Sequence, residues 1–301
     1  MVKRSLTTVM RIKSVISLIL VLVMLVSCSK APSDTSETAE VITETTTEST
    51  TEQTTTSEET TEDPFKKPLI EEFDDQVRLL TFYRDDIEIH GAFVYPLGAE
   101  KGPYKTIVLS SPLYTSGWGV MDRAYLFAEA GYACVVFDFK TNVDGAPTKY
   151  LGDFIYDQVK DLNCVMDSLK YLPDVDTSNV YMWAHSMGGL TTAYVGAARK
   201  DEVKGLILVE PSIQKAQKMK FENEKTLDTD IFSVWADLDI PVIIIIGSEG
   251  TMKNEPEFYI SVADSLPKGK LVTVQGADHG MGGEYGVEMV RIALEAMESW
   301  G

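Results

Sequence analysis

The later part of the chain, residues 64–301, is predicted to be one α/β domain built on a mainly parallel sheet. Eight strand-like segments alternate with helix-like segments from residue 77 onward. The strands after the first hairpin are apolar throughout, as expected for strands that are buried on both faces. These two observations, together with about 240 residues of ordinary composition, predict a single large domain with helices covering both faces of the sheet.

The predicted elements follow one another in a regular order. The first two strands are joined at Arg84-Asp85-Asp86 as a hairpin, while Gly131 and Pro173 mark helix ends. The predicted strands are 77–83, 87–96, 105–111, 132–139, 179–185, 203–211, 241–248 and 269–276, and the predicted helices are 120–131, 153–172, 187–200, 255–266 and 283–300. Ligands bind at the carboxyl ends of parallel strands, so the loops that follow the strands are where a site is expected.

The N-terminal residues are predicted to direct the chain to a membrane. Four basic residues precede an apolar run over residues 15–26, which is shorter than the about 20 residues that span a bilayer and matches the layout of a secretory signal. The run ends in Leu-Val-Ser-Cys at Cys28 and resembles the bacterial lipobox. That resemblance implies cleavage after a signal peptide of residues 1–27 and a lipid on Cys28. An ordinary signal peptide with a chance cysteine is the alternative.

Residues 28–63 are predicted to be a disordered tether. From residue 31 they consist of Thr, Glu and Ser almost throughout and contain no aromatic residue, so they cannot bury enough apolar surface to fold. The composition resembles spacers in surface lipoproteins of Gram-positive bacteria. The folded domain of residues 64–301 is therefore expected on the extracellular face of the cell membrane, held there by a lipid.

Charge and cysteine content limit the partners. The formal net charge of −19 argues against binding to nucleic acid and to anionic lipid headgroups. We expect a monomer with a small-molecule ester substrate, no nucleic acid, and membrane contact through the N-terminal lipid alone. Cys134 and Cys164 lie in apolar strand-like and helix-like runs, where two buried free thiols are favoured over a disulfide. No Cys/His cluster in the sequence has metal-ligand spacing, so neither a metal nor a cofactor is expected.

A candidate nucleophile lies between a predicted strand and a predicted helix. The run Ala184-His185-Ser186-Met187-Gly188 resembles the nucleophile elbow G-x-S-x-G, with alanine in place of the first glycine. The strained turn needs small residues two positions before and two positions after the serine, and this run has them. The alternative is a simple helix cap, but a cap would not require small residues at those places.

A serine hydroxyl needs a base. The chain has three histidines. His90 lies in the early hairpin, and His185 is next to Ser186, with its side chain expected on the other side of the strand end. His279 remains, in the segment "VQGADHGMGG" directly after the last predicted strand. Elimination therefore selects His279 as the base.

Residues 70–301 resemble the α/β-hydrolase superfamily. The segments "SSPLYTSGWG" and "WAHSMGG" are similar to polyester-hydrolase, cutinase-like and dienelactone-hydrolase-like proteins, and the hairpin "RDDIEIHGAFVYP" also resembles serine aminopeptidases and monoacylglycerol lipases. The resemblance implies the α/β-hydrolase fold and a serine hydrolase that cleaves carboxylic esters through an acyl-enzyme. A peptidase with the same machinery and a noncatalytic binding protein on a hydrolase scaffold remain as alternatives.

The catalytic acid departs from the pattern of the superfamily. Most members carry an aspartate as Gly-x-x-Asp after the strand that matches 241–248, but Gly250 stands in that place here. Glu249 lies one residue earlier. Some families, the haloalkane-dehalogenase-like ones among them, take the acid from the end of the preceding strand. Glu210 holds that position and is favoured over Glu249.

The oxyanion hole requires two backbone N–H groups. The resemblance assigns one to Met187, which directly follows the nucleophile. The other should come from the loop after strand 105–111, where Pro112 has no N–H and leaves Leu113 or Tyr114. Alignment with the Pro-Gly-Tyr-Thr form of polyester hydrolases selects Tyr114, whose ring would line the acyl pocket near Trp118.

The cap over the site is predicted to be small. About 30 residues separate Glu210 from Pro241, which is room for a short, partly helical cap but not for a large lid. An open site of this kind suits short acyl chains or bulky substrates that bind at the periphery.

Overall fold

The structure is a computed structural model that describes residues 66–98, 102–143, 150–221, 227 and 231–300. The predicted signal peptide, the lipid attachment at Cys28 and the tether up to residue 63 lie outside these residues. In the described part, no helix is both long enough and apolar enough to cross a membrane.

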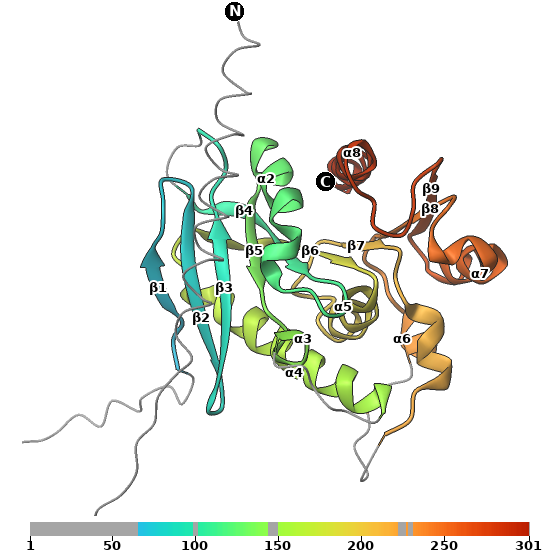
Figure 1. The fold of residues 1–301 in the computed structure, drawn as a ribbon, viewed down its shortest axis with the longest axis horizontal. Coiled ribbons are helices and arrows are strands. Elements are labelled where there is room, and N and C mark those ends of the chain that lie inside the picture. The colour runs from blue at the N-terminus through green and yellow to red at the C-terminus, as the bar shows by residue number, and fades with distance from the viewer. Residues whose placement is uncertain (1–65, 99–101, 144–149, 222–226, 228–230, 301) are drawn as a thin grey trace, which may run out of the picture. The chain divides into compact units, whose positions relative to one another are not determined.

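The described residues form one nine-stranded sheet, shown in Figure 1. Its spatial order is β1-β2-β3-β5-β4-β6-β7-β8-β9. Pairing is antiparallel from β1 to β5 and parallel from β5 to β9. The strands are β1 (Leu69–Glu72), β2 (Val77–Arg84), β3 (Ile87–Val94), β4 (Tyr104–Ser110), β5 (Ala133–Phe137), β6 (Val175–His185), β7 (Leu206–Val209), β8 (Val242–Gly247) and β9 (Gly269–Val274).

The predicted α/β architecture is confirmed, and the predicted number of strands was one too few. The additional strand is β1, which pairs with β2 at the edge of the sheet. All four of its residues are exposed, so it lacks the apolar pattern by which the other strands were recognised. The Leu-Ile-Glu-Glu sequence of β1 forms a strand because β2 offers it backbone partners.

Helices cover both faces of the sheet, as the apolar strands require. Side chains alternate along β6, so Tyr181 and Trp183 pack on one face while Met182 and Ala184 pack on the other. The first face is covered by α2 (Met121–Glu129) and α8 (Glu284–Ser299), and the second by α4 (Leu151–Ser168), α5 (Met187–Ala198) and α7 (Pro256–Ser265), as Figure 1 shows. The buried residues form two apolar clusters, one on each side of the sheet.

Short helical elements fill the connections. They are η1 (Gly117–Val120), α3 (Lys140–Val143), η2 (Leu169–Tyr171), η3 (Ile213–Lys218), α6 (Ile231–Trp235) and η4 (Thr251–Asn254). Between β7 and β8, Ile213, Ile231 and Trp235 are fully or almost fully buried. The described parts of this connection are the short helical elements η3 and α6, and their apolar residues pack into the core.

The two described cysteines are free thiols. Cys134 lies in β5 and Cys164 lies in α4, and both are buried without a disulfide between them. Burial raises the pKa of the Cys164 thiol to about 11. The prediction of two buried free thiols is confirmed, and the elevated pKa leaves the Cys164 thiol protonated and weakly nucleophilic at neutral pH.

Five of the six parallel strands bring the loops of the candidate site to one edge of the sheet. The carboxyl ends of β4, β6, β7, β8 and β9 lie at Ser110, His185, Val209, Gly247 and Val274. Neighbouring strands run in the same direction and in register, so the residues that follow these ends come together in space. This edge carries the candidate site.

Candidate active site

Ser186 occupies a strained turn between β6 and α5. Its φ of 55° and ψ of −119° are rare for a residue with a side chain. The turn brings the helix close to the end of β4, because a Cβ at Gly188 would lie 2.5 Å from the carbonyl oxygen of Ser111. The Ser186 side chain makes no capping hydrogen bond to α5 in the described structure. The strained geometry is therefore that of an elbow rather than of a helix cap.

His279 lies beside Ser186. It follows β9, and its Nε2 is 2.9 Å from Ser186 Oγ while its Nδ1 is 2.9 Å from Glu210 Oε2. The tautomer follows from these partners, because an acceptor-only carboxylate requires the proton on Nδ1. Nε2 then accepts the hydrogen bond from the Ser186 hydroxyl. The three side chains form a relay from a carboxylate through an imidazole to a hydroxyl.

Glu210 is fully buried at the end of β7, with a φ of 45°. Its Oε1 accepts a hydrogen bond of 2.6 Å from the N–H of Gly247. Burial by itself raises the pKa of Glu210, but the hydrogen bonds from His279 and from Gly247 outweigh burial and bring the pKa below its usual value. Glu210 is therefore ionised at neutral pH and can stabilise a protonated His279.

Comparisons with known proteins identify the fold of the chain. Among solved structures, Est1E from Butyrivibrio proteoclasticus matches with a TM-score of 0.58 over 73% of this chain and 99% of that chain, at 17% identity. A dienelactone hydrolase from Anabaena variabilis matches with a TM-score of 0.59 over 78% and 99%, at 16% identity. The chain has the α/β-hydrolase fold.

Two further comparisons add detail to the α/β-hydrolase match. XC6422 from Xanthomonas campestris, described as a serine hydrolase without a lid, has a TM-score of 0.56 over 76% of this chain and 96% of that chain, at 18% identity. The family model for serine aminopeptidase, S33, matches residues 101–238, which include Ser186 and Glu210 but not His279. No curated protein matches the sequence. At these identities the structural likeness establishes the fold and not the substrate.

Glu210 fills the space that the usual acid of an α/β-hydrolase would take. A Cβ built at Gly250 would lie 2.1 Å from Glu210 Oε1, so no side chain fits at position 250 while Glu210 is present. Glu249, the alternative acid, is exposed and pairs with Lys253 at 3.2 Å instead. Of the two glutamates considered from the sequence, Glu210 is the one in contact with His279.

Thr251 belongs to the same cluster, and sequence reasoning gave it no role. Its Oγ1 lies 3.1 Å from Glu210 Oε2 and 2.7 Å from His279 Nδ1. The hydroxyl can donate to the carboxylate while it accepts from the imidazole N–H. This contact adds a second group that fixes the orientation of the His279 ring.

Tyr114, the sequence-based choice for the second oxyanion donor, has its N–H engaged by another residue. The loop of residues 111–115, here called the β4 loop, turns at Tyr114, whose φ is 58°. The N–H of Tyr114 donates to Asn142 Oδ1 at 3.3 Å and is not free for a substrate. The N–H of Leu113 has no hydrogen-bond partner among the described residues. The contact counts against Tyr114 and favours Leu113, the alternative that the missing N–H of Pro112 left open.

His185, excluded as a base, supports the loop that carries His279. Its Nε2 lies 2.7 Å from the carbonyl oxygen of His279, to which it donates, and the two rings are 5.2 Å apart. Burial lowers the pKa of His185 to about 4, so its imidazole is neutral at neutral pH. Its ring bonds the backbone of His279 and thereby supports the position of the base.

The depressed pKa of His185 predicts a loss of stability in mild acid. The unfolded state binds a proton on this histidine below about pH 6.5 and the folded state does so only below about pH 4, so folding stability falls as the pH drops through this window. Between pH 7 and pH 5 the contribution is about 2 kcal/mol. Urea unfolding at both pH values should show this loss in the wild type and a smaller loss in His185→Gln. An equal pH dependence in the two proteins would contradict the assignment.

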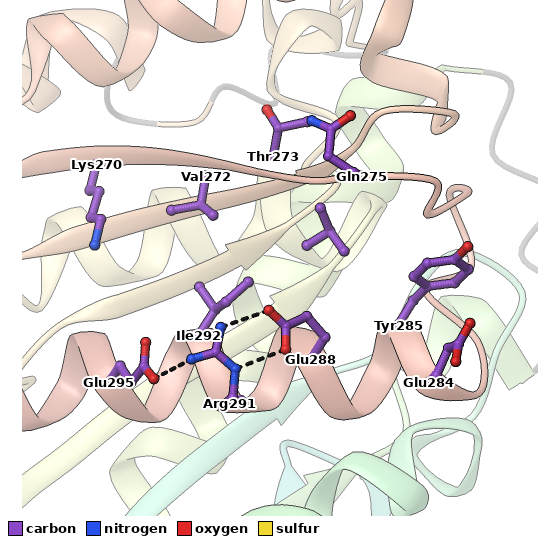
Figure 2. A pocket seen from close by; sticks show the side chains of 11 residues that line it. Lys270, Val272, Thr273, Gln275, Glu284, Tyr285, Glu288, Arg291, Ile292 and Glu295 are labelled. Atoms are coloured by element: carbon purple, nitrogen blue, oxygen red, sulfur yellow. Dashed lines mark hydrogen bonds and ion pairs between the residues drawn. The ribbon is translucent and has the colours of Figure 1, made fainter.

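Two hollows lie near β9 and the loops beside it, and only one of them borders a residue of the relay. One of about 400 Å³ is lined by residues 249–251, Lys253, Asn254 and residues 278–280, so it borders His279 directly. The other, about 700 Å³, lies between β9 and α8, and Figure 2 shows that its Arg291 is paired with Glu288 and Glu295. The larger groove contains none of the relay residues. Of the relay residues, only His279 lines the smaller hollow.

Exposed aromatic side chains lie within the β4 loop and just after it. Tyr114 is 77% exposed and Trp118 is 46% exposed, although large aromatic side chains are normally well buried. The described residues contain no cluster of three His, Cys, Asp or Glu side chains arranged to hold a metal ion.

Proposed function

We propose that the protein is a serine hydrolase that cleaves carboxylic esters through an acyl-enzyme intermediate. The observation that carries the proposal is the relay from Glu210 through His279 to Ser186, with 2.9 Å at each contact. An elbow with a strained serine and a buried, ionised carboxylate behind the histidine are the elements that activate a hydroxyl for acyl transfer. A binding protein on the same scaffold would need neither feature.

In the proposed mechanism, Ser186 Oγ attacks the ester carbonyl and His279 Nε2 takes its proton. Glu210 stabilises the imidazolium, and the N–H groups of Met187 and Leu113 receive the oxyanion. His279 then returns the proton to the leaving alcohol, and the acyl group stays on Ser186. A water, deprotonated by His279, releases the acid and restores the hydroxyl.

The exposed site favours esters with short acyl chains, or bulky substrates, over esters whose long chains would have to be buried. His279 has a side chain that is 35% exposed, and the described parts of the short connection between β7 and β8 pack into the core. Exposed Tyr114 and Trp118 offer aromatic faces near the β4 loop. These features support short acyl chains or bulky substrates that approach from the surface.

Labelling with a fluorophosphonate probe tests the proposed function. The wild type should be labelled on Ser186 and should hydrolyse p-nitrophenyl acetate and butyrate faster than the long-chain palmitate ester. Peptidase activity is the second candidate because the serine aminopeptidase model matches residues 101–238. Aminoacyl p-nitroanilides separate the two, since only a peptidase should cleave them at rates close to those for esters. The absence of labelling would overturn both candidates.

We propose further that the enzyme is anchored on the extracellular face of the membrane through Cys28. The support is the lipobox-like end of the apolar run, followed by an acidic tether. A wild-type protein expressed in a Gram-positive host should incorporate an alkyne fatty acid, and Cys28→Ala should lose that label and either enter the medium or remain as precursor. Cys134→Ala serves as the control, because that thiol is buried. A wild type without label would refute the anchor.

A further inference from the structure

A buried asparagine, Asn142, forms hydrogen bonds with the β4 loop. Asn142 lies in α3 and is 8% exposed. Its Nδ2 donates to the carbonyl oxygens of Pro112 and Thr115 at 2.9 Å and 3.0 Å and lies 3.4 Å from Ser111 Oγ, while its Oδ1 accepts from the N–H of Tyr114. One side chain therefore contacts four residues of the loop that carries the proposed Leu113 donor.

The chemistry of these contacts requires an amide. The loop presents carbonyl oxygens to one end of the side chain and an N–H to the other, so the partners also fix which end is nitrogen and which is oxygen. A carboxylate at position 142 would face two carbonyl oxygens without a proton to share. An apolar residue would leave the N–H of Tyr114 without its partner and would remove one of the two donors to each carbonyl oxygen of Pro112 and Thr115.

The contacts continue from the loop to the helix of the nucleophile. Gln158 in α4 donates from Nε2 to Asn142 Oδ1 at 3.3 Å, and its Oε1 accepts from Thr191 Oγ1 at 2.7 Å. Gln158 and Thr191 are both fully buried. Thr191 lies in α5, the helix that begins at Met187. A buried hydrogen-bonded chain thus links the two segments that supply the proposed oxyanion donors.

We propose that Asn142 is a positioning residue that, through Gln158 and Thr191, sets the separation of the two oxyanion donors. The proposal rests on the serine hydrolase function above. Apolar residues at these three buried positions could fill the same volume. The polar side chains therefore contribute hydrogen bonds of fixed direction, which apolar side chains would not provide. Displacement of a catalytic group by about 1 Å can cost about 10²-fold in rate, so a small loop shift would have a large effect.

Asn142→Leu tests the proposal. The variant should lower kcat for p-nitrophenyl butyrate by about 10²-fold, the effect of losing one oxyanion donor, and should change KM by less than about threefold. Asn163→Leu is the matched control, because Asn163 is an α4 asparagine that bonds Arg199 instead. Its kcat should stay within about twofold of the wild type, as for a change away from the site.

A transition-state analogue separates positioning from general damage. A trifluoromethyl ketone forms a hemiketal oxyanion on Ser186, and its inhibition constant should rise in Asn142→Leu by about the same factor by which kcat falls. A neutral, unreactive amide analogue should bind both proteins equally. If both ligands weaken together, or if a folded Asn142→Leu keeps kcat within about threefold, the proposal is overturned.

Thr191→Val provides a second test that does not depend on the folding of Asn142→Leu. Valine keeps the shape and removes the hydroxyl that bonds Gln158. It should lower kcat by about three- to tenfold, and an unchanged kcat would overturn the proposal. Failure of the function itself has a different signature, because the wild type would then remain unlabelled by the fluorophosphonate.

Discussion

Ser186→Ala is expected to reduce ester hydrolysis by at least about 10⁴-fold and to remove fluorophosphonate labelling. The Ser186 hydroxyl, which donates its hydrogen bond to His279 Nε2, is the only group of the relay that can form the acyl-enzyme. The side chain is small and makes no capping bond in the described structure, so the melting temperature should change little. Initial rates with p-nitrophenyl butyrate and a thermal unfolding curve measure both effects.

Ser178→Ala is the control for this variant. Ser178 bonds Asp176 at the far end of β6 and lies in an exposed setting, so its loss should leave the rate unchanged. Residual activity of Ser186→Ala within about tenfold of the wild type would exclude the covalent mechanism, because loss of the nucleophile should cost far more than that.

Glu210→Gln is expected to lower kcat by about 10³- to 10⁴-fold, with Glu249→Gln close to the wild type. Glutamine keeps the volume and can still accept from Gly247, but it has no charge to stabilise the imidazolium. It can also present an N–H to His279 Nδ1 and so favour the wrong tautomer. Glu249 contacts Lys253 at the surface, which gives no reason for a large effect. Equal losses in the two variants would contradict the assignment of the acid.

The crowding at Gly250 allows a stricter test of the same assignment. Gly250→Asp alone should be nearly inactive, because its side chain collides with the Glu210 carboxylate. The double variant Glu210→Ala with Gly250→Asp opens that space and moves the charge to the position that most α/β-hydrolases use. It should recover part of the activity that Glu210→Ala loses. If Gly250→Asp alone is fully active, the overlap of the two positions has been misjudged.

Most of the sheet was predictable because its strands are buried. The apolar runs that become β4 to β9 have strand length and lie between turn residues, and the helices α2, α4 and α8 have a clear amphipathic period. β1 was missed because it is an exposed edge strand, which owes its conformation to pairing with β2. The short α3 was also missed, since four residues are too few to show a period.

The relay was predictable in part. Ser186 follows a strand and has small neighbours, and elimination among three histidines points to His279, so local sequence is informative for both. The contact between Glu210 and His279 depends on how β7, β8 and β9 pack, which the linear sequence does not display. The choice between Leu113 and Tyr114 depends on which N–H is already engaged, and the N–H of Tyr114 donates to Asn142, which lies in a distant part of the chain.

Gln158 could have been recognised from the sequence as a polar residue on an apolar helix face. It lies on the buried face of α4, where Ile155 and Leu162 are fully buried, and it is itself fully buried. A polar residue in an apolar stripe needs a hydrogen-bond partner. The sequence thus indicates that a buried polar contact exists, although it cannot say that the partners are Asn142 and Thr191.

The position of β9 at the edge of the sheet determines how the protein would lose activity on warming. Within the described sheet, β9 is the outermost strand and pairs with β8 alone, while β6 and β7, which precede Ser186 and Glu210, are interior strands. Edge elements open at lower free-energy cost than the core of a domain. Fraying of this edge would carry His279 away from an otherwise intact nucleophile. The temperature at which activity is lost would then lie below the melting temperature, and cooling would restore activity by re-docking one strand rather than by refolding the domain.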